Sequence, residues 1–166
     1  KGAGGALGVS LDEALYEGFG PGGVGMLIET VTDKKQRTVA EVKNVIEKNG
    51  GTMAGQGAVS YLFHKTGEII VNTFGKTSDE ILQIAMENNI EDVEEDEGAA
   101  FLYVEASQLQ NAKKGIEADG LVIEDAGLVY RPLSKIEVAP DMAEKVFNLV
   151  EKLEELDDVQ KVYTNL

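Results

Sequence analysis

The amino-acid sequence predicts an α+β protein made of two lobes, one inserted into the other. Three observations lead to this fold class. Four segments carry the start signals of helices, runs rich in β-branched and aromatic residues lie between them, and acidic residues concentrate in the middle of the chain. With 166 residues, 43% of them hydrophobic, the chain can bury one moderate core or two small ones.

Each expected helix begins with a short oxygen-bearing side chain that is followed three residues later by an acid or an amide. Such a pair can satisfy the unpaired backbone N–H groups of a first turn. Apolar residues at helical spacing follow each start. Gly50 and Gly120 stand where a left-handed residue would end two of these helices. The four starts are Thr38 with Glu41, Thr77 with Glu80, Ser107 with Gln110, and Asp141 with Glu144.

The order of helices and β-rich runs predicts the domain organisation. It consists of a β-α-β unit, a complete β-α-β-β-α-β unit and a closing strand-helix-strand, which an inserted domain explains. We therefore expect two ferredoxin-like α/β sandwiches. The first lobe is discontinuous and comprises residues 12–66 plus 135–166, and the inserted acidic lobe comprises residues 67–134. The expected strands are residues 24–31, 58–64, 67–71, 99–105, 127–131, 135–138 and 160–163.

Charge and composition exclude several classes of function. The net charge of −15 argues against this chain as a free-standing binder of polyanions. Residues 66–137 hold 16 acids and 5 bases, whereas the rest holds 14 acids and 10 bases. The absence of cysteine excludes disulfides, thiolate catalysis and cysteine zinc sites. No apolar run is long enough to span a membrane.

The motifs that could indicate an enzyme or a cofactor site lack the context they need. Residues 18–23 match G-x-G-x-x-G, but a strand rather than a helix follows, which predicts a tight turn. Residues 91–97 are acidic without a calcium-loop framework, so we expect a solvated loop. His64 is the only histidine, and Asp157 and Asp158 are expected to set the turn before the last strand. We expect no catalytic residue, cofactor or metal, and thus no enzyme.

The only dense basic cluster lies just before an expected helix and contains Lys34, Lys35 and Arg37. Backbone N–H groups at a helix start also favour anions, so this cluster is a candidate for contact with nucleic-acid phosphates or the ribosome. A solvated charged loop is the alternative. Arg37 can also pair with Asp33 or Glu41 and so organise the turn itself.

Three further residues complete the candidate contact set. Lys43 lies further along the same helix. Phe19 stands in the glycine-rich segment, which is first interpreted as a tight turn enforced by glycine; in the second interpretation its ring stacks on an unpaired base. Arg131 precedes Pro132 near the passage between the lobes and is first interpreted as part of a hinge, with contact to a partner as the second interpretation.

Four sequence motifs together resemble a known family. They are Tyr-Glu-Gly-Phe-Gly-Pro-Gly-Gly at residues 16–23, Asn-Gly-Gly at 49–51, Gly-Ala-Val-Ser-Tyr-Leu-Phe at 57–63, and Asp-Asp-Val-Gln-Lys-Val-Tyr-Thr-Asn at 157–165. This combination closely resembles the YebC/PmpR family, which includes YebC-like transcriptional regulators and the translational activator of cytochrome c oxidase subunit one. The resemblance covers nearly the whole chain.

The resemblance implies an architecture and a function. Family members have a basic helical first domain before two α/β domains, so residues 1–11 are expected to be the remnant linker of a missing N-terminal helical domain. The implied function is a non-enzymatic regulator that binds RNA and the ribosome, mainly through the missing domain, in the bacterial cytoplasm or, in a eukaryote, in the mitochondrion. A sequence-specific DNA-binding transcriptional regulator is the alternative. A small-molecule sensor has only the fold in its favour.

Overall fold

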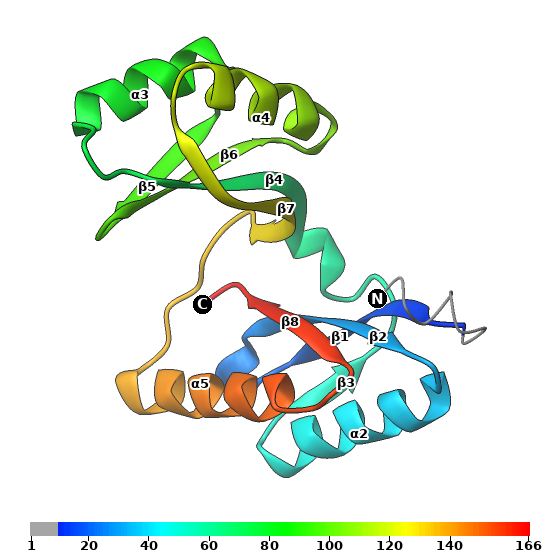
Figure 1. The fold of residues 1–166 in the computed structure, drawn as a ribbon. Helices are drawn as coiled ribbons and strands as arrows, with labels where there is room; N and C mark the ends of the chain where they lie inside the picture. Colours follow the sequence, from blue (N-terminus) through cyan, green and yellow to red (C-terminus); the bar gives the residue numbers. More distant parts are fainter. Residues whose placement is uncertain (1–9) are drawn as a thin grey trace. The chain divides into compact units, whose positions relative to one another are not determined.

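The structure is a computed structural model that describes residues 10–166. The described chain divides into two compact units. Lobe 1 comprises the described residues up to His64 together with Pro132–Leu166, and lobe 2 comprises Lys65–Arg131. In each lobe two α-helices lie on one face of a four-stranded sheet (Figure 1). The predicted α+β class with two α/β lobes is therefore confirmed. The linker expected at residues 1–11 lies almost entirely outside the described residues.

Lobe 1 contains the strands β1, β2, β3 and β8 in the sheet order β3-β1-β2-β8, and neighbouring strands are antiparallel. Helices α2 and α5 cover one face of this sheet (Figure 1). The core between them is made of apolar side chains that include Met26, Ile28, Ile46 and Leu149. The elements are β1 (Asp12–Phe19), β2 (Gly25–Thr32), α2 (Lys35–Lys48), β3 (Thr52–Ala54), α5 (Pro140–Glu154) and β8 (Val159–Thr164).

The first strand, β1, was not expected from the sequence. The alternation of polar and apolar residues that predicts a strand is interrupted there by Gly18 and by Glu17, whose carboxylate is buried in the fold. The glycine-rich segment after it forms the tight turn of a β1–β2 hairpin, in which Gly23 N donates to Gly20 O at 3.1 Å. Gly22 has φ +77°, a left-handed conformation that glycine adopts without strain.

Lobe 2 has the β-α-β-β-α-β order expected for the middle of the chain, with the sheet order β5-β6-β4-β7. Its core contains apolar side chains such as Ile69, Ile81, Leu102 and Ile116. The acidic segment expected as a loop leading into a strand instead forms an edge strand, in which all four carboxylates are exposed. The elements are β4 (Phe63–Asn72), α3 (Ser78–Glu87), β5 (Asp92–Asp96), β6 (Ala99–Glu105), α4 (Leu109–Ala118) and β7 (Val122–Pro132).

The helix ends confirm some of the predicted signals. Thr77 caps α3, because its hydroxyl accepts from Glu80 N at 3.1 Å while Glu80 Oε1 accepts from Thr77 N at 2.9 Å. Gly50 and Gly120 follow α2 and α4 with φ +89° and +93°, as expected for left-handed residues at helix ends. The other three start signals were wrong in detail: no side-chain cap is formed by Thr38, Ser107 or Asp141.

Two expected strands do not form. Residues 58–64 were expected to be extended, but Ser60–Leu62 is a 3₁₀ turn, because a carboxylate of β1 binds backbone N–H groups that a sheet would need. Residues 135–138 have no strand partner; Ile136 N donates to Asn165 O at 2.8 Å as an isolated contact. β-propensity therefore gave the wrong prediction for these two segments, where tertiary contacts occupy backbone groups that strand pairing would need.

Candidate nucleic-acid interface

The start of α2 is joined to the turn before β8 by a carboxylate that accepts three side-chain hydrogen bonds. Asp158 Oδ2 accepts from Thr38 Oγ1 at 2.8 Å, from Thr32 Oγ1 at 3.0 Å and from Arg37 Nη2 at 3.0 Å. Thr32 and Thr38 are buried, so their hydroxyls need partners inside the protein. Burial raises the pKa of Asp158, but the three hydrogen bonds outweigh it and hold the pKa below its usual value.

Arg37 is the cation of the basic cluster that the fold has paired with acids. Its Nη2 lies 3.0 Å from Asp158 Oδ2 and 3.2 Å from Asp33 Oδ1, and the hydrogen bond to Asp158 raises the pKa of the guanidinium. Asp33 or Glu41 was the partner expected for Arg37, and Asp33 is the one that pairs with it. Because two carboxylates share its charge, Arg37 mainly holds this turn together.

Lys34 and Lys35 supply the positive charge that is not paired at this end of α2. Both side chains are exposed, and neither forms an ion pair with any residue in the range 10–166. Together with Gln36 and Arg37 they surround a hollow of about 430 Å³ that has no acid among its described lining residues. The first backbone N–H groups of α2 add positive potential nearby. This arrangement suits a phosphate group.

The remaining candidates of lobe 1 are placed differently. Lys43 is exposed on α2, further along the helix than the basic cluster. Phe19 ends β1, is partly buried, and lies opposite Gly25 on one side and Thr52 on the other. Its ring therefore belongs to the sheet next to the glycine turn and not to a projecting loop.

Arg131 lies in lobe 2 within a set of opposite charges. Its guanidinium lies over the ring of Tyr103 at 3.6 Å, and its two terminal nitrogens contact Glu94 at 2.8 Å and Asp92 at 3.2 Å. Burial and the nearby Glu68 raise the pKa of Tyr103, which keeps its hydroxyl protonated to donate to Glu68. Arg131 thus pairs with two of the four acids of the edge strand β5, a role that the local sequence did not indicate.

Glu17 is the second position whose role the sequence did not reveal. Its carboxylate is only 4% exposed and accepts three backbone hydrogen bonds of 2.8 Å, from the N–H groups of Gly57, Val59 and Ser60. Burial raises the pKa of Glu17, but these hydrogen bonds lower it below the usual value. The carboxylate fixes a loop whose tip, residues 55–58, is exposed and uncharged.

No local signal could have identified these two acids. Glu17 lies 40 residues or more from the N–H groups it binds, and Asp158 lies 120 residues from Thr38. The sequence analysis assigned Asp158 only to a turn, and its backbone does take part in one, since Asp158 O accepts from Val31 N at 2.9 Å. Its side chain joins more of the chain, since it accepts hydrogen bonds from Thr32, Arg37 and Thr38.

The described residues offer little for other chemistries. Between residues 10 and 166, no group of three or more His, Asp or Glu side chains is placed to hold a metal ion. Within that range, every helix is too short or too polar to cross a membrane. The hollow at the start of α2 is lined by three cations and an amide.

Comparison with known proteins gives consistent results. Residues 11–166 match the model of a family described as the TACO1/YebC second and third domain. A probable transcriptional regulatory protein of Acidithiobacillus ferrooxidans is 44% identical over 165 residues, which cover 99% of this chain and 66% of that protein. One of Chlorobium phaeovibrioides is 38% identical over 167 residues, covering 100% of this chain and 67% of that protein.

A solved structure shares the fold. The crystal structure of a conserved hypothetical protein from Aquifex aeolicus superposes with a TM-score of 0.89 at 38% identity, covering 93% of this chain and 64% of that one. The chain thus spans about two thirds of the length of the relatives it matches. The matched model, the identities and the shared fold agree, and the chain belongs to the TACO1/YebC family, of which it contains the second and third domains.

Proposed function

We propose that this protein is a non-enzymatic regulator of gene expression that contacts RNA on the ribosome through the start of α2. The observation that supports this most directly is the pair of exposed cations, Lys34 and Lys35, around a hollow that no described acid lines. Lysine ammonium groups and the N–H groups of a helix start are common partners of phosphate oxygens.

The distribution of charge supports lobe 1 as the contacting side. Lobe 2 carries 15 acidic and 5 basic residues, whereas lobe 1 carries 15 acidic and 10 basic ones. An acidic surface repels the phosphate backbone, so lobe 2 would limit the orientations in which nucleic acid approaches. We place this activity in the bacterial cytoplasm, as the resemblance implies.

A DNA-binding transcriptional regulator is the second candidate. The relatives of Acidithiobacillus and Chlorobium are named probable transcriptional regulatory proteins, and that name favours DNA as the target. The same lysines could contact the phosphates of a DNA duplex, because phosphate contacts carry no sequence information. Since the chain spans about two thirds of these relatives, the remaining third of such a protein would add its own contacts.

The test is binding of the 166-residue chain to ribosomal subunits, single-stranded RNA and duplex DNA at two salt concentrations. We expect salt-sensitive binding to RNA and subunits, weakened by the double substitution Lys34→Gln/Lys35→Gln. The matched control is Lys145→Gln/Lys152→Gln, which removes the same charge from exposed positions of α5. For single strands, each lost phosphate contact should reduce the slope of log affinity against log salt by about 0.7.

The outcomes separate the two candidates. A preference for duplex DNA with the same lysine dependence would replace RNA by DNA as the target. If both double substitutions weaken binding equally, only the net charge of the chain matters, and the proposal that the start of α2 contacts nucleic acid is wrong.

A further inference from the structure

A hollow of about 430 Å³ lies beside β1 in lobe 1, next to the start of α2. Tyr16 and Leu15 contribute apolar surface, Gln56 contributes an amide, and Lys35 contributes an ammonium group. Glu13 and Glu17 also line it, but the carboxylate of Glu17 is occupied by three backbone N–H groups. Its volume falls within the range of small-molecule pockets, about 300–1,000 Å³.

The hollow exists because β3 is short. β3 pairs only with Glu17, Gly18 and Phe19, so no described strand pairs with residues 12–16 of β1 on that side. The chain leaves the sheet after Ala54 and turns at Gly57, which has φ +89°. Glu17 then holds the loop in its new direction through 2.8 Å hydrogen bonds. One buried carboxylate therefore keeps the edge of β1 open.

The chemistry of the lining suits an unpaired nucleobase. An amide such as that of Gln56 offers both a donor and an acceptor to the edge of a base, and alternate residues of an open strand edge offer backbone N–H and C=O groups. Tyr16 is half-buried against the core of lobe 1 and so forms a rigid aromatic wall. Lys35 stands where the phosphate of a bound nucleotide would need a cation.

We propose that this hollow holds one unpaired base of a single-stranded RNA, with Gln56 at the edge of the base and Lys35 at its phosphate. This inference rests on the proposed function and assigns a base-binding site to it. Glu13 is exposed in the hollow and opposes the phosphate charge. Its presence limits the affinity for phosphate and gives the proposal a gain-of-binding test.

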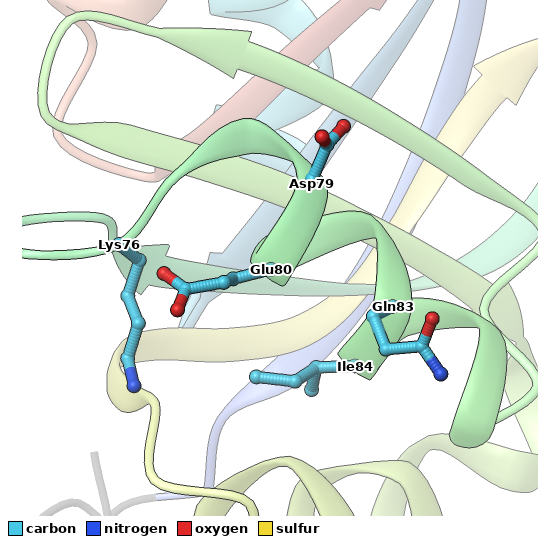
Figure 2. A pocket seen from close by; sticks show the side chains of 5 residues that line it. All are labelled: Lys76, Asp79, Glu80, Gln83 and Ile84. Carbon is cyan, nitrogen blue, oxygen red and sulfur yellow. The ribbon is translucent and has the colours of Figure 1, made fainter.

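A second hollow, of about 310 Å³, lies against α3 in lobe 2 (Figure 2). It is lined by two acids, Asp79 and Glu80, and one cation, Lys76, which is the same formal charge as the lining of the hollow beside β1, but its lining includes no aromatic side chain. In Figure 2 the Asp79 side chain points away from Lys76 and Glu80. Glu80 already serves the helix cap at Thr77. The aromatic ring of Tyr16 therefore favours the hollow beside β1 as the site for a base.

The experiment measures binding of the 166-residue chain to a short fluorescent RNA of mixed sequence and to a length-matched strand without bases. Wild type should bind the abasic strand about tenfold more weakly, since a lost base contact is worth about 1–3 kcal/mol. Gln56→Ala should bind the normal RNA about fivefold more weakly but the abasic strand as wild type does. Lys35→Gln should weaken binding to both strands, and Glu13→Gln should strengthen it. Lys48→Gln, exposed at the other end of α2, is the charge control.

The outcomes distinguish this inference from the function on which it rests. If Lys35→Gln weakens RNA binding while Gln56→Ala does not, phosphate contact stands and the base site is refuted. If the chain binds no RNA, both proposals fail. Amide NMR adds an independent measurement: the signals of residues 13–16 and Gln56 should shift on addition of RNA. If these signals shift with an extended peptide and not with RNA, the hollow binds a peptide strand and the base site is refuted.

Discussion

Thr38 donates a hydrogen bond of 2.8 Å to Asp158, although 120 residues separate the two in the sequence. Thr38 is 1% exposed, and the same carboxylate oxygen accepts from Thr32 and Arg37. This contact joins the first turn of α2 to the end of α5 and the start of β8. It therefore fixes the place where the exposed lysines of the candidate interface begin.

Replacement of Asp158 by alanine should destabilise lobe 1. The buried hydroxyl of Thr32 would lose its acceptor and that of Thr38 would keep only Lys34 O, at 3.3 Å, so we expect the free energy of unfolding to fall by about 2 kcal/mol. Urea denaturation followed by circular dichroism measures this change. Asp157→Ala is the control, because Asp157 is exposed, and it should change stability by less than about 0.5 kcal/mol. Equal effects of the two substitutions would contradict the role assigned to Asp158.

The contribution of Asp158 should depend on pH. Its pKa is lower in the folded protein than in the unfolded chain, so the unfolded state binds more protons as the pH falls. The stability it provides is therefore present above the unfolded pKa of about 3.9 and is lost as the pH falls through the folded pKa. The difference in unfolding free energy between wild type and Asp158→Ala should be constant near neutral pH and shrink below about pH 4. A difference that grows on acidification would show the opposite shift.

Replacement of Glu17 by glutamine should loosen the loop that it holds. An amide is uncharged and its NH₂ group cannot accept, so at least one of the N–H groups of Gly57, Val59 and Ser60 would lose its acceptor and the others would keep only a neutral one. We expect a loss of about 1–3 kcal/mol in stability and faster amide exchange at these positions. Hydrogen exchange measured by NMR tests this. Glu13→Gln, on the same strand but exposed, should leave the exchange unchanged.

Gly115 should tolerate no larger side chain while Asn88 is present. A Cβ at position 115 would overlap Asn88 Oδ1, and Asn88 is held by hydrogen bonds to Ile84 O and Asp119 Oδ2. Gly115→Ala should therefore lower the free energy of unfolding by about 1–3 kcal/mol, although alanine favours a helix by about 1 kcal/mol.

A double-mutant cycle with Asn88→Ala checks this prediction by thermal unfolding. In the Asn88→Ala background the overlap is absent, so Gly115→Ala should be neutral or stabilising. Gly127→Ala is the control within lobe 2, since an added Cβ there meets nothing within 4 Å. A destabilisation of Gly115→Ala that persists without Asn88 would contradict the proposed overlap.

Arg131→Gln should affect stability more than binding of nucleic acid. The substitution leaves Asp92 and Glu94 without their partner and removes the cation over Tyr103, so we expect a loss of about 1 kcal/mol. Affinity for single-stranded RNA should change by less than about twofold, because the charge of Arg131 is already matched by two acids. A large loss of RNA affinity without a change in stability would instead make Arg131 a contact residue, as the sequence analysis considered.

Part of the candidate site could be predicted from the sequence. The basic cluster at Lys34 and Lys35 was visible because it is contiguous, and the pairing of Arg37 with Asp33 was visible because only four positions separate them in the sequence. The open edge of β1 could not be predicted. It depends on where β3 ends, and that end depends on the hydrogen bonds of Glu17 to a loop 40 residues away.

The α+β class, the cap at Thr77, the glycine ends of α2 and α4, and the family resemblance could all be predicted before the structure was known. These features depend on periodicity, on caps that span three residues, or on contiguous motifs, which are local properties. The roles of Glu17, Asp158 and Arg131 could not be predicted in this way, because each acts on groups that come within hydrogen-bond distance only when the lobe folds. A hydrogen bond acts over about 3 Å, and the local sequence does not reveal which distant segments the fold brings that close.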